Sequence, residues 1–123
     1  MIEIRRNANN SQLFIIFVMN IEFEDKALEE LYLNGFTNSR HYKRLPQDIV
    51  KRYVKVVNYL RSVRRVEDLF LIKSLHYEKK KGNLKNVEAV WINDQYRLIF
   101  RSSSNCHGIV VNVLLIEISK HYE

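Results

Sequence analysis

Three groups of residues in the later part of the chain could act together on a phosphodiester. A lysine-rich loop spans Glu78–Lys85, Arg97 lies in a strand-like run, and Lys120–His121–Tyr122 stands near the end of the chain. Lysine and arginine attract phosphates, and histidine transfers protons near neutral pH because its ordinary pKa is about 6.5. The three groups could therefore bind and cut a phosphodiester, provided that the fold brings them onto one face of a sheet.

Alternating apolar residues predict the strands that must position these groups. The runs Val90–Ile92, Tyr96–Phe100 and Ile109–Ile118 have the pattern of half-buried strands, and the polar turn Asn93–Gln95 separates the first two. Arg97 is predicted to lie on the face opposite the aromatic residues of its strand. If the three strands pair as a meander, the histidine tail, the arginine and the lysine loop meet over one face.

The earlier part of the chain predicts one strand and two helices. Asn20–Glu24 alternates as a strand, and Asp25 can cap a helix over Lys26–Leu33 that Gly35 ends. Pro46 suits the first turn of a second, amphipathic helix, whose outer side is basic. This order favours an α+β fold in which two helices pack on one face of a small antiparallel sheet, leaving the other face free for a ligand.

Residues 1–18 differ from the remainder, and we expect them to be an upstream extension of a domain that covers residues 19–123. Met19 begins a segment that resembles the start of a chain, MNIEFEDKALEELYLNG. The alternative is a genuine extra strand. The apolar run Leu13–Val18 is too short for the core of a signal peptide or for a membrane span. The intact mass of the native protein tests the hypothesis, because a species that begins at Met1 contradicts it.

The charge is concentrated in the later part of the chain. Residues 1–39 hold three basic and six acidic residues, whereas residues 40–123 hold seventeen basic and eight acidic residues. This asymmetry favours a polyanion or an acidic protein as the partner of the later part, and an ordinary solvated basic surface is the plain alternative. The single cysteine, Cys106, favours a reducing cytoplasm. No zinc-ligand spacing and no glycine-rich nucleotide loop occur, so neither a metal nor a cofactor is expected.

The segment LHYEKKKGNLKNVEAVWINDQYRLIF, with the opening MNIEFEDKALEELYLNG, the helix RLPQDIVKRYVKVVNYL and the ending EISKHYE, resembles the HigB branch of the RelE-type toxins. These plasmid maintenance system killer-like proteins are the toxin halves of bacterial type II toxin–antitoxin modules. The resemblance covers nearly everything from Met19 to Glu123. It implies a compact RelE-like fold and a cytoplasmic endoribonuclease, an mRNA interferase, that cuts messenger RNA on the translating ribosome and so inhibits translation. It also implies neutralisation by a cognate helix-turn-helix antitoxin similar to HigA.

The resemblance carries over to three positions. His76 stands where the family has a loop histidine before its lysine–glycine pair, here Lys81–Gly82. Arg97 stands at the strand arginine of the family. His121 matches the histidine that ends the usual Asp-Tyr-His tail. These matches make His76, Arg97 and His121 the leading candidates for the site.

Several residues depart from the family pattern. Ser119 and Lys120 replace the acid and the tyrosine of the tail, and Tyr122 and Glu123 extend beyond its histidine. The loop is two residues longer than in the family. Trp91 stands where many relatives carry an arginine, which removes one possible phosphate contact. Because of these departures, the sequence does not assign the individual catalytic steps to particular residues of the tail.

Cleavage of RNA without a metal requires activation of the ribose 2′-OH, protonation of the departing 5′-oxygen and stabilisation of the charged phosphorane. We expect His121 and His76 to share the two proton transfers, with the base and the acid left unassigned. Arg97 is expected to stabilise the phosphorane. Assistance is expected from Lys81 or Lys120, and from Tyr122, which could orient His121 or stack on a base.

Further RNA contacts are expected from basic residues of the loop and the strands, namely Lys79, Lys80, Lys85 and Arg101. Each assignment has a plainer alternative. His76 could be a polar residue of the core, Arg97 could pair with Asp94 or Glu117, and Trp91 and Tyr96 are expected in the core. Two other functions also remain open: a basic RNA-binding module without catalysis, and an inactive toxin homologue that still binds its antitoxin.

Overall fold

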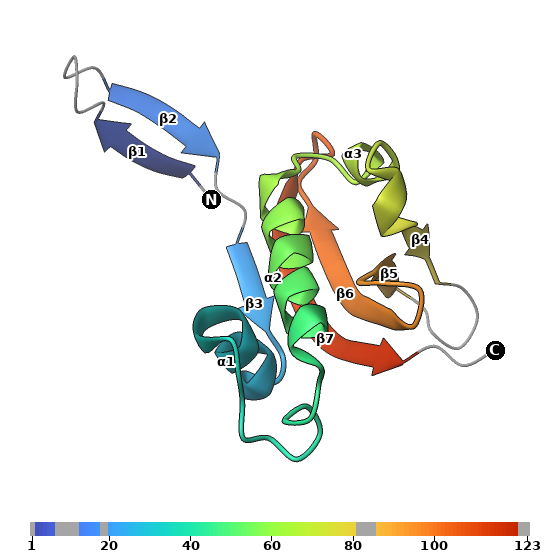
Figure 1. The fold of residues 1–123 in the computed structure, drawn as a ribbon. Coiled ribbons are helices and arrows are strands. Elements are labelled where there is room, and N and C mark those ends of the chain that lie inside the picture. Colours follow the sequence, from blue (N-terminus) through green and yellow to red (C-terminus); the bar gives the residue numbers. More distant parts are fainter. Residues whose placement is uncertain (1, 7–12, 18–19, 81–85, 121–123) are drawn as a thin grey trace.

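The computed structural model describes residues 2–6, 13–17, 20–80 and 86–120. The strands β1 (Ile2–Arg6) and β2 (Leu13–Phe17) pair with each other in an antiparallel two-stranded sheet. A five-stranded sheet has the order β3-β7-β6-β5-β4 (Figure 1). Its strands are β3 (Asn20–Phe23), β4 (Glu78–Lys79), β5 (Glu88–Trp91), β6 (Tyr96–Ser104) and β7 (Val110–Lys120).

The meander predicted from the sequence is confirmed, because β5, β6 and β7 are consecutive antiparallel neighbours. The short β4 adds a further antiparallel pair at one edge, in the part of the chain that was expected to be a loop. At the other edge, β3 runs parallel to β7, so the sheet is not antiparallel throughout. Parallel neighbours need a long connection between them, and here the helices and β4–β6 supply it.

The helices are α1 (Lys26–Asn34), α2 (Gln47–Ser62), the short α3 (Glu67–Phe70) and the 3₁₀ turn η1 (Lys73–Leu75). The predicted caps of α1 are confirmed. The Ala27 N–H donates to Asp25 Oδ1 over 2.9 Å, and Gly35, at φ 82°, donates its N–H to the Leu31 carbonyl. Pro46 precedes α2 at its N-cap position rather than lying within its first turn. None of the helices in the described ranges is long and apolar enough to cross a membrane.

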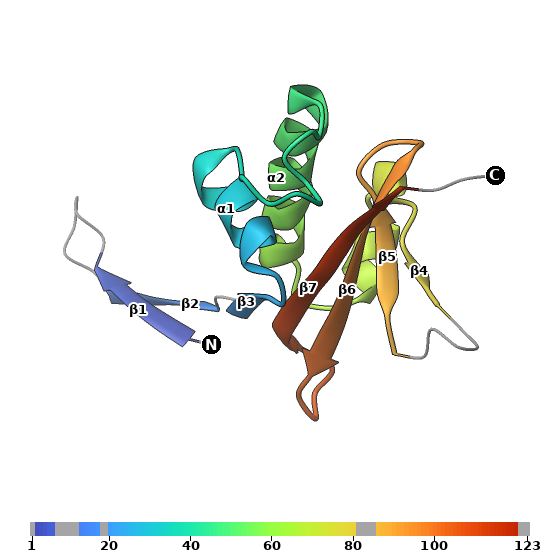
Figure 2. The same ribbon diagram turned by 90° about the horizontal axis from the view of Figure 1, so that it is seen from below.

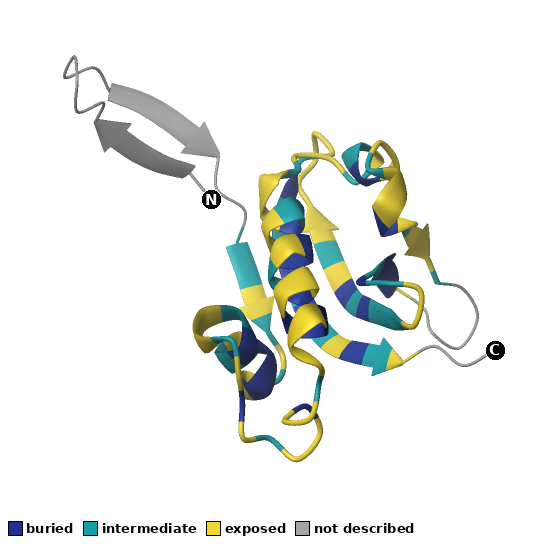
Figure 3. Ribbon diagram, viewed as in Figure 1, coloured by how far each residue is buried: buried dark blue, intermediate teal, exposed yellow. Residues whose placement is uncertain are grey.

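The helix α2 supplies one wall of the core. It packs its apolar stripe onto one face of β6 and β7, and its solvent side is exposed along its length (Figure 3). Tyr53 lies at the centre of this stripe, donates its hydroxyl to the Leu28 carbonyl over 2.8 Å and so ties α2 to α1. Burial raises the pKa of Tyr53. The exposed side carries the basic residues that the sequence predicted: Lys51, Arg52, Lys55 and Arg61.

The two main helices lie on the same side of the sheet (Figure 2). Leu98 and Phe100 are fully buried beneath them, together with Val113 and Leu115 of β7. Arg97 and its neighbours at alternate positions face the other way, and none of them is buried. The prediction of two helices over one face, with Arg97 on the opposite face, is therefore confirmed.

Candidate functional site

Trp91 is the centre of the candidate site. It is the last residue of β5, and in the antiparallel register it lies opposite Arg97 of β6. The imidazole of His76 stacks on the indole, with ring centroids 3.7 Å apart and an angle of 24° between the planes. The guanidinium carbon of Arg97 lies 4.1 Å from the centroid of the same indole. The structure thus brings together two of the predicted site residues, His76 and Arg97, on the indole of a residue that was not predicted to belong to the site.

The backbone places His76 in this stack. His76 directly follows η1, and its N–H donates to the Lys73 carbonyl over 3.2 Å. It has a left-handed conformation, with φ 44° and ψ 49°. Residues other than glycine seldom adopt this conformation, and such positions are frequent at functional sites. The histidine side chain is exposed, so the alternative in which His76 is a core residue is wrong.

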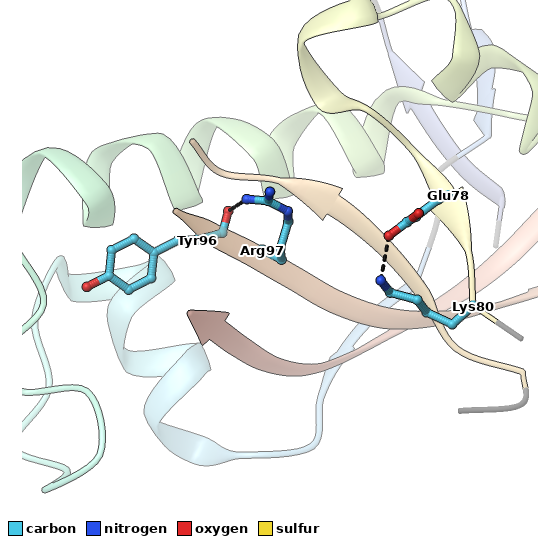
Figure 4. Close-up of polar contacts among 4 residues, drawn as sticks. All are labelled: Glu78, Lys80, Tyr96 and Arg97. Atoms are coloured by element: carbon cyan, nitrogen blue, oxygen red, sulfur yellow. Dashed lines mark hydrogen bonds and ion pairs between the residues drawn. The ribbon is translucent and has the colours of Figure 1, made fainter. Parts of the chain in front are cut away.

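Arg97 is held by the turn that precedes it. Its Nη1 donates to the carbonyls of Asn93, over 2.9 Å, and of Tyr96, over 3.3 Å; Figure 4 shows the contact with Tyr96. Arg97 forms no ion pair with Asp94 or Glu117, all three of which the structure describes. The guanidinium therefore keeps its charge available for an anion, in an orientation that the backbone fixes.

Trp91 corrects an expectation drawn from the sequence. It was expected in the core, but it is only partly buried, because it stands at the last position of β5, where the strand gives way to a turn. Tyr96 is also only partly buried, although it packs against the core. For an aromatic residue at the end of a strand, the sequence contains no signal that distinguishes a core residue from a site residue.

The indole is expected to position His76 and Arg97, which gives a testable prediction. If the protein cleaves RNA, as the sequence resemblance implies, Trp91→Ala should lower the rate constant of cleavage by roughly tenfold to a hundredfold, because small misplacements of reacting groups are costly. Trp91→Phe should recover most of the loss, since a ring remains to support both side chains. Single-turnover cleavage measures the effect, and thermal unfolding serves as the control. Equal losses in the two variants would contradict a positioning role.

The register of β6 and β7 shows which residues at the end of β7 lie opposite Arg97 and Tyr96. Ser119 lies opposite Arg97, whereas Lys120 lies opposite Tyr96 and therefore on the other face of the sheet. The Lys120 Nζ lies 5.9 Å from the centroid of the Tyr96 ring. The structure thus does not place Lys120 beside Arg97. The predicted site residues Lys81, His121 and Tyr122 lie outside the described residues, as do the predicted RNA contact Lys85 and the hypothetical start Met19.

A cavity of about 780 Å³ brings together two of the predicted RNA contacts. Lys79 of β4 and Arg101 of β6 both line it, and the Arg101 Nε donates to the Asn86 carbonyl over 3.0 Å. Lys80, which directly follows β4, instead forms an ion pair with Glu78 of that strand (Figure 4). Lys79 and Arg101 are therefore better placed than Lys80 to contact a phosphate.

Glu88 anchors this cavity. The residue is 5 % exposed, and its carboxylate accepts hydrogen bonds from the Tyr77 hydroxyl, over 2.7 Å, and from the N–H and hydroxyl of Ser102. Burial and the hydrogen bond to Glu88 raise the pKa of Tyr77, which directly follows His76 in the chain. Sequence reasoning missed Glu88, because a charged residue in a strand normally faces solvent.

Removal of this carboxylate should destabilise the fold. We expect Glu88→Ala to lower the free energy of unfolding by about 2–4 kcal/mol, since it leaves the partly buried Ser102 N–H and Tyr77 hydroxyl without their acceptor. Urea denaturation provides the measurement. Glu78→Ala, which removes an exposed carboxylate from the neighbouring strand, is the matched control and should change the free energy by less than about 0.5 kcal/mol. A similar change in both variants would contradict the anchoring role.

Comparison with known proteins identifies the family. Residues 21–116 match the family described as "RelE-like toxin of type II toxin-antitoxin system HigB". Toxin HigB-1 of Vibrio cholerae is 30% identical over 97 residues, which cover 79% of this chain and 95% of that protein. This chain therefore belongs to the HigB-like family of RelE-type toxins of type II toxin–antitoxin systems.

The solved structures that are similar to this chain have lower sequence identities. The YoeB–YefM complex from Staphylococcus aureus has a chain that is 21% identical, with a TM-score of 0.49 and coverage of 85% of this chain and 98% of that one. A YoeB/ParE toxin from Agrobacterium tumefaciens is 15% identical, with a TM-score of 0.48 and coverage of 85% of this chain and 100% of that one.

Proposed function

We propose that this toxin is a ribosome-dependent endoribonuclease that cuts messenger RNA, without a metal, by attack of a ribose 2′-OH on the adjacent phosphate. The observation that carries the proposal is the meeting of His76 and Arg97 on the indole of Trp91. Family membership and the basic character of the later part of the chain support it. The action is proposed to take place in the cytoplasm, where ribosomes translate.

The chemistry assigns one task to each side chain. One histidine takes the proton from the 2′-OH, whose oxygen attacks phosphorus, and another gives a proton to the departing 5′-oxygen. Arg97 stabilises the negative charge that develops on the phosphorane, through a guanidinium already oriented by the turn before it. His76 is one of the two histidines. His121 is proposed as the other, since it comes two residues after Ser119, the partner of Arg97 in the register.

The end groups of the RNA fragments test this mechanism. Attack by the 2′-OH yields a 2′,3′-cyclic phosphate on one fragment and a 5′-hydroxyl on the other. We expect a reaction of purified toxin, ribosomes and a translated message to give these ends, and the same message without ribosomes to be cut far more slowly. Fragments with 5′-phosphates would contradict the 2′-OH mechanism, and equal cutting without ribosomes would contradict ribosome dependence.

A cognate helix-turn-helix antitoxin, similar to HigA, is the proposed protein partner. Support comes from the family itself, whose members are toxins of type II toxin–antitoxin systems. Co-expression of the toxin with a neighbouring gene for a small helix-turn-helix protein should restore growth and yield a complex that copurifies. Failure of such a pair to form a complex would contradict this assignment.

An inactive homologue that still binds its antitoxin is the second candidate. The observation that favours it is that Trp91, at a position where the sequence resemblance implies an arginine, contacts both His76 and Arg97. Under this alternative the toxin binds its antitoxin but yields no RNA fragments. The reaction with ribosomes separates the two candidates directly.

A further inference from the structure

A groove of about 680 Å³ lies between α2 and the turn that joins β5 to β6. On one side it is lined by five residues of α2. Four of them carry polar groups, namely Asp48, Arg52, Lys55 and Tyr59, and their spacings of four, three and four place them on one stripe of the helix. On the other side it is lined by His76, Trp91, Asn93 and Asp94. The groove thus begins at the candidate site and continues along the helix.

The charges that line the groove are mixed. Arg52 and Lys55 are exposed, and neither forms an ion pair with any residue of the described ranges. Asp48 and Asp94 face the same space. Two carboxylates would repel a purely anionic ligand such as an acidic peptide. They suit a ligand that combines a phosphate with hydrogen-bond donors, because carboxylates accept hydrogen bonds from hydroxyl and amino groups.

Aromatic side chains also line the groove. The rings of Tyr59 and His76 border the groove, and unpaired RNA bases stack on such rings. The volume is within the range of small-molecule sites and is large enough for a nucleotide. A nucleotide of single-stranded RNA therefore matches the lining in all three respects: phosphate for the cations, ribose and amino donors for the carboxylates, and a base for the rings.

We propose that this groove is a subsite for one nucleotide of the RNA strand, next to the nucleotide at the scissile bond, with Arg52 and Lys55 contacting its phosphate. The proposal rests on the proposed function, which it extends from the candidate catalytic side chains to α2. It explains why the basic residues of α2 at positions 52 and 55 share a stripe with Tyr59. Lys51, which lies on the same helix but does not line the groove, has no place in the subsite.

Binding of RNA in the absence of ribosomes tests the proposal independently of cleavage, because the proposed enzyme cuts free RNA far more slowly. A fluorescein-labelled hexaribonucleotide, which keeps its ribose hydroxyls, reports affinity by anisotropy, and Trp91, the single tryptophan of the chain, reports occupation of the groove by its emission. The double variant Arg52→Ala/Lys55→Ala should weaken binding by about tenfold or more. It should also lower the salt dependence of log K by roughly 0.7 for each phosphate that the protein no longer neutralises. The matched control, Lys51→Ala, should weaken binding less than about twofold.

The possible outcomes are distinct. The double variant removes two charges and Lys51→Ala removes one. If binding weakens equally for each charge removed, the loss is a general charge effect and the subsite is overturned. Absence of oligonucleotide binding to the wild type, or displacement of the RNA by an equal concentration of an acidic peptide, would overturn it as well. Binding with the expected losses but without cleavage of translated messages would support the subsite and contradict the proposed function.

Discussion

Arg97→Ala is expected to lower the rate constant of RNA cleavage by about 10²–10³-fold, the cost of removing one group that stabilises developing charge. The structure supplies the physical reason, because the carbonyls of Asn93 and Tyr96 hold the guanidinium in a fixed orientation over Trp91. Arg97→Lys keeps the charge but not the fork of donors, so it should recover only part of the activity. Single-turnover cleavage of a translated message measures both variants.

Arg101→Ala is the matched control for this prediction. Arg101 lies on the same strand and on the same face as Arg97, but it lines the cavity that Glu88 anchors rather than contacting Trp91. Its loss should weaken RNA binding while leaving the single-turnover rate constant at saturation nearly unchanged. If Arg97→Ala behaves in the same way as Arg101→Ala, Arg97 binds RNA and does not stabilise the transition state.

His121→Ala is expected to lower the rate constant of RNA cleavage by about 10²–10⁴-fold, because general acid–base catalysis contributes factors of this order. If His121 and His76 divide the two proton transfers, the pH profile of the rate should be bell-shaped. Each single variant should then lose one limb of the bell, which a purely structural residue would not cause. The rate is measured as a function of pH for the wild type and both variants.

His107→Ala is the control for the loss of a histidine. His107 is exposed in the turn between β6 and β7 and contacts none of the candidate site residues that the structure describes. Its removal should leave the rate and the pH profile unchanged. A fully active His121→Ala variant would remove His121 from the mechanism and leave His76 without its proposed partner.

Much of the fold could be predicted from the sequence, because the signals that define it are local. The alternation in β5, β6 and β7 specified their faces, and Asp25 and Gly35 specified the ends of α1. The parallel pairing of β3 with β7 could not be predicted in this way, since alternation indicates the face of a strand and not its neighbour. The strand β4 is too short, at two residues, to show any period.

The candidate site was predicted in part. His76 and Arg97 were selected from the family pattern, and the structure brings them together. The role of Trp91 was missed because its contacts come from two separate elements, the end of η1 and the start of β6. Arg52 and Lys55 were expected only as part of a basic outer side, because their position opposite His76 depends on the packing of α2 against the sheet. Long-range packing of this kind leaves no periodic trace in the sequence.

Growth after induced expression, followed by mapping of mRNA ends in the same cells, tests the central claim most directly. The wild type is predicted to arrest growth and to produce new cuts within translated frames, and His121→Ala is predicted to produce neither. Soluble wild-type protein that causes neither arrest nor cuts would contradict the nuclease and favour the inactive homologue. Arrest without new mRNA ends would contradict cleavage as the cause of toxicity.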